Sequence, residues 1–115
     1  MAIPHAKAGQ LIDVRPLGAA MVNAKTQTIV KTETLEVIRI VMAADKDIAR
    51  HHVAGEITVQ CLEGRVEFRI GEVEHELTAG TLLYLEGADE HSLHATEDSS
   101  LLVTIVLIHK GSTAK

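Results

Sequence analysis

The chain has 115 residues, which fits one domain, and 46% of them are hydrophobic, which is enough for a core and excludes a disordered chain. Its formal net charge is −5, and its only aromatic residues are Phe68 and Tyr84. Nucleic-acid binding needs clustered cations and, for single strands, aromatic stacking surfaces, so no nucleic-acid partner is expected.

The compartment is predicted from cysteine content and from the ends of the chain. The single cysteine, Cys61, has no partner for an internal disulfide, which favours a reducing environment. The N-terminus lacks the charged start and apolar run of a signal peptide, and no apolar run could span a bilayer. We therefore expect a cytoplasmic protein without a membrane partner. We further expect an N-terminal arm at 1–9, one domain at 10–110 and a tail at 111–115.

Short β-branched segments separated by glycine-containing turns follow one another along the chain. Leu11–Arg15 is predicted as a short edge strand ending before a proline. Residues 19–30 are weakly patterned, with a strand suggested around Thr26 and Val30. Clearer strands follow at 35–42, 56–62, 65–70, 73–77, 82–85, 91–96 and 101–108. The pattern predicts an all-β domain, an antiparallel β-barrel or double-stranded jelly roll with little or no helix.

The segment Leu101–Ile108 is apolar on both faces of its predicted strand. A strand of this kind needs cover on each side, from a second sheet or from a partner subunit. We therefore expect a homodimer.

The seven histidines are sorted by the alternation of side chains along a strand. His91 shares a face with Leu93 and should point inward, whereas His94 should be solvated. His75 lies between two apolar residues and is predicted to be a core histidine with one hydrogen-bond partner. His51 and His52 are adjacent, so both can enter the interior only if the backbone bulges.

Two residues of the strand at 56–62 have alternative interpretations. Cys61 is on the apolar face and is predicted to be a small buried hydrophobe, because nothing nearby would lower its pKa. Gln60 is on the opposite face, and would line the interior only if the polar face did so. The simpler interpretation places Gln60 outside or in a dimer interface.

The segment from Gly80 to His91 resembles the second motif of the cupin family. That motif has glycine, five residues, proline, any residue, glycine, two residues, histidine, three residues and asparagine. Here its positions carry Gly80, Glu86, Ala88, His91 and Ala95. The first glycine and the histidine match, whereas the other three positions do not.

The preceding segment is similar to the first cupin motif when it is counted back from Gly64. That motif has glycine, five residues, His-x-His, three or four residues, glutamate, six residues and glycine. The positions that match are His51 and Gly64. The opening glycine, second histidine and glutamate are replaced by Asp45, Val53 and Ile57, respectively.

The resemblance implies a divalent-metal site that contains His51 and His91. His52 and Glu56 lie one place from the missing ligand positions and keep the family spacing, so a local shift at Val53–Gly55 would add them. Glycine at position 55 would make such a kink inexpensive. Imidazole and carboxylate ligands of this kind suit Fe, Mn, Ni or Zn.

Two functions are consistent with this pattern. The first is a small cupin with a metal and a small-molecule ligand in its interior, which could be an enzyme of the dioxygenase or isomerase kind. The second is a non-catalytic binding or regulatory cupin module without metal, favoured by the apolar replacements Val53 and Ile57. Sequence does not name the reaction.

Overall fold

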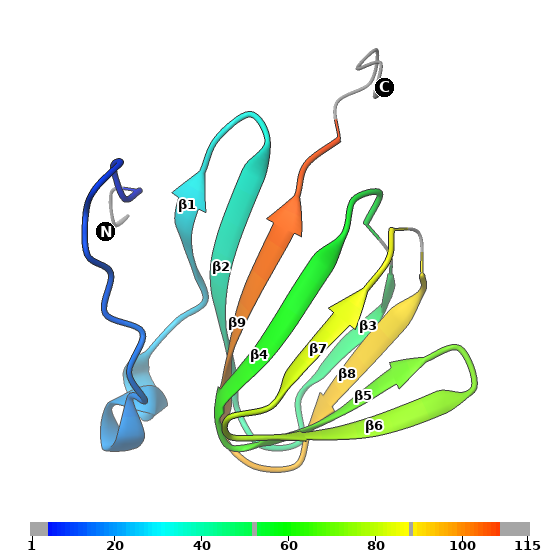
Figure 1. Cartoon of the computed structure of the whole chain (residues 1–115). Coiled ribbons are helices and arrows are strands. Elements are labelled where there is room, and N and C mark those ends of the chain that lie inside the picture. Colours follow the sequence, from blue (N-terminus) through cyan, green and yellow to red (C-terminus); the bar gives the residue numbers. More distant parts are fainter. Residues whose placement is uncertain (1–4, 52, 88, 109–115) are drawn as a thin grey trace.

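The computed structural model describes residues 5–51, 53–87 and 89–108, and for His51 only the backbone. Its described strands form two antiparallel sheets, one with the order β1-β2-β9-β4-β7 and the other with the order β3-β8-β5-β6. Figure 1 shows the second sheet lying beside the β7 end of the first, with the N-terminal segment on the far side of β1. This arrangement confirms the all-β jelly-roll prediction, although the sheets are not closed into a barrel.

From residue 35 onward the elements follow the sequence pattern except at β3, where no strand was predicted, and at β9, which begins two residues earlier than predicted. A 3-10 helix, η1, spans Gly18–Asn23 and is the only helix among the described residues. The strands are β1 Gln27–Lys31, β2 Leu35–Met42, β3 Asp47–His51, β4 Ile57–Glu63, β5 Arg65–Ile70, β6 Val73–Thr78, β7 Leu82–Leu85, β8 His91–Ala95 and β9 Ser99–Val106.

The core lies between the two sheets and is aliphatic apart from Phe68. In β4 the side chains of Ile57, Val59 and Cys61 are buried, whereas those between them are only half-buried. The period of two predicts this alternation, because successive residues of a strand face opposite sides of the sheet. Buried residues from six other strands complete the core: Met42, Val66, Phe68, Leu77, Leu85, Leu93, Ala95, Leu101 and Val103.

Two local predictions are wrong. Residues 11–15 form no strand: Asp13 accepts hydrogen bonds from the backbone and guanidinium of Arg15, so these contacts are local and join no neighbouring strand. His75 is exposed and not a core residue, because β6 is the outermost strand of its sheet and only its far end, at Leu77, is buried. Parity places a side chain on a face but does not say how far the opposite sheet extends.

A charged network attaches the N-terminal segment to the outer face of the first sheet. Arg39 of β2 is only 8% exposed and donates through Nη2 to the carbonyl of Arg15 at 2.6 Å and to Glu63 at 3.4 Å. The Glu63 carboxylate also accepts from the amides of Leu17 and Gly18 and from the Ser100 hydroxyl. These bonds hold the start of η1 against β2, β4 and β9.

The network controls the ionisation of Glu63. Burial alone would raise the pKa of this carboxyl group. The bonds from Leu17, Ser100 and Gly18 and the charge of Arg39 outweigh burial, and they lower the pKa below its ordinary value. Glu63 therefore stabilises the fold in its ionised form.

The turn that follows Glu63 requires glycine. Gly64 has φ +90°, and a Cβ atom there would lie 2.2 Å from the Ser99 hydroxyl oxygen. Both the backbone conformation and the contact exclude a larger residue. This turn leads β4 of one sheet into β5 of the other.

No helix among the described residues is long and apolar enough to cross a membrane.

The substitution Glu63→Gln should lower the free energy of unfolding by about 2 kcal/mol at pH 7, because the amide cannot replace the charge facing Arg39. The folded-state pKa of Glu63 is depressed, so its contribution is complete above pH 4.5, its ordinary value, and is lost as pH falls through the lower folded-state pKa. The difference between wild type and variant should therefore shrink below pH 4.5 in urea unfolding followed by circular dichroism.

The matched control is Glu72→Gln, which makes the same charge change in the exposed β5–β6 turn. It should leave stability nearly unchanged at each pH. Equal losses in the two variants, or a Glu63→Gln loss that does not vary with pH, would show that the network does not act as described.

Candidate functional site

The backbone brings His51 and His91 together as a cross-strand pair. His51 is the last residue of β3 and His91 the first of β8, and the two are directly paired in the ladder. The β3–β8 register shifts between Ile48 and His51, so three steps along β3 match two along β8. This irregularity places His51 opposite His91, and Cβ atoms of such pairs lie about 5 Å apart.

His91 lies on the inner face of its sheet, as predicted, and is only 3% exposed. Its ring is stacked on Phe68, with a centroid distance of 5.3 Å and an interplanar angle of 16°. Its Nδ1 lies 3.1 Å from the carbonyl oxygen of Asp89, which can only accept, so Nδ1 carries the hydrogen. In the neutral ring this leaves the lone pair on Nε2, the form in which imidazole binds a metal or accepts from a ligand.

The loops of the two motif segments are in direct contact beside this histidine pair. A Cβ atom on Gly87 would lie 1.9 Å from the carbonyl oxygen of Ala54, and one on Gly55 would lie 1.7 Å from that of Val106. Gly55 is therefore required for close approach of β9, and the backbone here has little space to move. A local shift at Val53–Gly55 was expected to bring further metal ligands to the site. The observed register shift lies earlier in the chain than this loop, within β3.

Apolar side chains occupy the second histidine position and the glutamate position of the first motif. Ile57 is 5% exposed and belongs to the core, and Val53 is half-buried and packs against it. Hydrophobic neighbours such as Phe68 strengthen each polar contact that His91 makes. The described cavity that includes His91 is also lined by Arg50, Arg69, Glu72 and Glu90, which suits a ligand with polar or ionised groups.

Glu56 faces away from the interior. Its side chain is exposed, and its Oε2 accepts a short hydrogen bond from the Tyr84 hydroxyl on the outer face of the first sheet. This contact raises the pKa of Tyr84, because the neighbouring carboxylate disfavours the phenolate. The structure thus brings His51 and His91 together but leaves Glu56 on the opposite side of β4.

His52 and the side chain of His51 lie outside the described residues. Among the described residues, no group of three or more His, Cys, Asp or Glu side chains is close enough to hold a metal ion. Metal ligation by His51, His91, His52 and Glu56 stays a prediction.

The other candidates lie outside the interior or are inert. His94 is on the outer face, where its Nδ1 lies 2.7 Å from Asp47 Oδ1, and this bond raises its pKa. Cys61 is fully buried, and burial raises the pKa of its thiol, so it is a structural residue. Gln60 is half-buried on the outer face opposite Leu82 and Leu102, as the simpler interpretation expected.

The chain belongs to a known family. A family model described as "Cupin domain" matches residues 38–108, which is more than half of the chain. A comparison with curated proteins gave no significant match.

Solved structures share the fold at low sequence identity. A conserved protein of unknown function from Streptococcus pyogenes is 18% identical, with a TM-score of 0.73, and the match covers 96% of this chain and 97% of that one. A cupin superfamily protein from Desulfitobacterium hafniense is 13% identical, with a TM-score of 0.75 and coverage of 90% and 100%.

A third structure, a predicted oxalate decarboxylase from Thermotoga maritima, is 18% identical, with a TM-score of 0.65 and coverage of 72% and 79%. At these identities the likeness shows the fold alone. The family match, the paired motif segments and the shared fold together identify the chain as a small member of the cupin family.

Proposed function

We propose that this cupin binds a small molecule in its interior, beside His91, together with a divalent metal held by His51 and His91. The cross-strand pairing of these two histidines supports the proposal most directly, because it joins both family motifs at one place. The Nδ1 bond to Asp89 supports it further, since it orients the imidazole of His91.

A divalent ion bound there would act as a Lewis acid toward an oxygen-containing ligand. Two protein ligands leave coordination positions for a chelating molecule such as a keto acid, a diketone or a sugar acid. The neighbour named as a predicted oxalate decarboxylase makes oxalate a further compound to test. In each case the stacked ring of Phe68 keeps His91 in place.

A metal-free binding module is the second candidate function. It is favoured by Val53 and Ile57, which put hydrocarbon where the family motif has ligating side chains. In this case His91 would hydrogen-bond the ligand through Nε2, and the interior would supply apolar contact.

The substitution His91→Ala separates the two candidates. If metal is bound, Fe, Mn, Ni or Zn at about 100 times its dissociation constant should raise the wild-type melting temperature by roughly 10 °C, and His91→Ala should abolish the rise. Elemental analysis of protein purified without a histidine tag should then find metal in the wild type and little in the variant.

The matched control is His94→Ala, three residues along the same strand but on its outer face. It should retain metal binding. Wild-type protein that contains no metal and gains no stability from any of the four ions would overturn the metal assignment. A metal-free wild type whose small-molecule affinity is weakened but not abolished by His91→Ala, as expected for the loss of one hydrogen bond, would then favour the metal-free module.

We also propose that the chain forms a homodimer through the outer face of the first sheet. Leu82, Tyr84 and Val106 are 63%, 53% and 42% exposed there, and half-buried Leu102 lies between them on β9. Leu82 and Tyr84 on β7 and Leu102 and Val106 on β9 flank Thr58 and Gln60 of β4, so this face combines exposed apolar side chains with uncharged polar ones, as interfaces do.

Light scattering after gel filtration tests the dimer. The wild type should have twice the chain mass, and Leu82→Lys should have the mass of one chain because the charge would be buried at the interface. The control Val73→Lys changes an exposed residue of β6 and should remain dimeric. A monomeric wild type, or a dimer unaffected by Leu82→Lys, would contradict this interface.

A further inference from the structure

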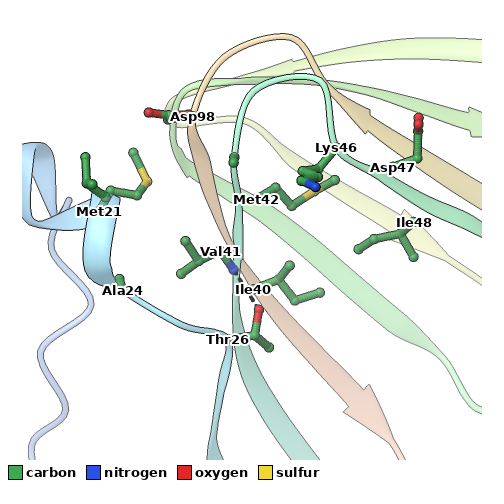
Figure 2. Close-up of a pocket in the computed structure, with 12 residues that line it drawn as sticks. Met21, Ala24, Thr26, Ile40, Val41, Met42, Lys46, Asp47, Ile48 and Asp98 are labelled. Carbon is green, nitrogen blue, oxygen red and sulfur yellow. Dashed lines mark hydrogen bonds between the residues drawn. The ribbon is translucent and has the colours of Figure 1, made fainter.

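A cavity lies at the opposite end of the β3–β8 pair from His51 and His91. It has a volume of about 510 Å3, within the usual size of small-molecule sites. Figure 2 shows it between η1, the end of β2 and the start of β3. His51 and His91 are at one end of the β3–β8 pair, whereas Asp47, which lines this cavity, pairs with His94 near the other end.

The cavity forms because two sheet edges are left uncovered here. β1 pairs with β2 only as far as Arg39, so the stretch from Ile40 to Met42 has no β1 partner. The Thr26 hydroxyl accepts from the Val41 amide at 3.0 Å and ends the pairing (Figure 2). On the opposite side, β3 is the edge strand of the second sheet.

The walls are mainly apolar and come from three separate segments. η1 supplies Met21, β2 supplies Ile40 and Met42, and β3 supplies Ile48. Methionine side chains adapt to ligand shape because they are unbranched and polarizable. The cavity therefore suits a flexible or flat hydrocarbon group.

Three charged residues line the cavity, and each of the two carboxylates makes a hydrogen bond to another described residue. Asp98 accepts a hydrogen bond from the Ala44 amide at 2.8 Å, and Asp47 bonds to His94 on the outer face at 2.7 Å. Figure 2 shows the Asp47 carboxylate pointing away from Met42. No described side chain forms an ion pair with the ammonium group of Lys46, which is thus available to an anion.

We propose that this cavity binds a small monocarboxylate with an aliphatic or aromatic body. The hydrocarbon lies against Met21, Met42 and Ile40, and the carboxylate accepts hydrogen bonds from Lys46. The site uses none of the residues assigned to the metal and ligand site beside His91, so it does not depend on the metal or ligand proposed there.

Sodium octanoate is a suitable probe, with octanol and octylamine as matched compounds that lack the negative charge. The chain has three methionines, and two of them line the cavity, so methyl NMR of ¹³C-methionine-labelled protein observes the site directly. Octanoate should shift the Met21 and Met42 methyl signals with a dissociation constant of about 1 mM, typical for a ligand of its size.

The variant Lys46→Gln should weaken octanoate binding by about tenfold, because a charge-assisted hydrogen bond is lost. The control Lys7→Gln makes the same charge change away from the cavity and should not alter binding. A chelator should have no effect, which distinguishes this site from a metal-dependent one.

Three outcomes would overturn the proposal. The first is that octanoate leaves both methyl signals unmoved at about 10 mM, well above the expected dissociation constant. The second is that octanol or octylamine binds as tightly, or that Lys46→Gln has no effect, so that the carboxylate is not recognised. The third is that the two signals shift with protein concentration instead, which would identify a second copy of the chain as the occupant.

Discussion

The central strand β9 is the constraint on which the rest of the structure depends. It pairs with β2 from Leu35 to Met42 on one side and with β4 from Ile57 to Glu63 on the other. The last strand of the described residues therefore unites segments that are far apart in sequence. Its inner residues Leu101 and Val103 are buried at the centre of the core, and such non-local burial is the main stabilising term of an all-β domain.

This arrangement also positions the site. With β4 held by β9, the Gly64 turn directs β5 into the second sheet, where β5 pairs with β8 and places Phe68 beside His91. The irregular end of β3 then brings His51 opposite His91. The outer face of the same central strands carries Glu63, Arg39 and Ser100, which attach the N-terminal segment. One scaffold thus supports an apolar interior and a polar outer network.

Most of the fold could be predicted from sequence because the strands alternate cleanly and glycines mark the turns. The inward orientation of His91 and the burial of Cys61 followed from parity alone. Parity did not predict the exposure of His75, because that exposure depends on how far β6 extends beyond the opposite sheet. The bulge in β3 was also hidden, since a register shift depends on the neighbouring strand and has no residue signature here.

Other features of the fold depend on contacts between distant residues, which the sequence does not identify. Arg39 is the only charge within the run Val37–Met42, and a lone charge in an apolar strand is a signal for a buried partner. Nothing in the sequence identified Glu63 as that partner. The cavity beside η1 was equally hidden, because it arises where β1 stops pairing with β2 and depends on the difference in their lengths.

The most direct measurement of the central claim is a crystal structure of protein soaked with Mn or Ni and recorded at the absorption edge of the metal. The account predicts an anomalous peak bonded to Nε2 of His91 and to the imidazole of His51, with other density inside the same wall of Phe68 and Ile57. A metal-soaked crystal with no peak at this pair, and no small molecule next to His91, would contradict the assignment of the functional site to the joined motif segments.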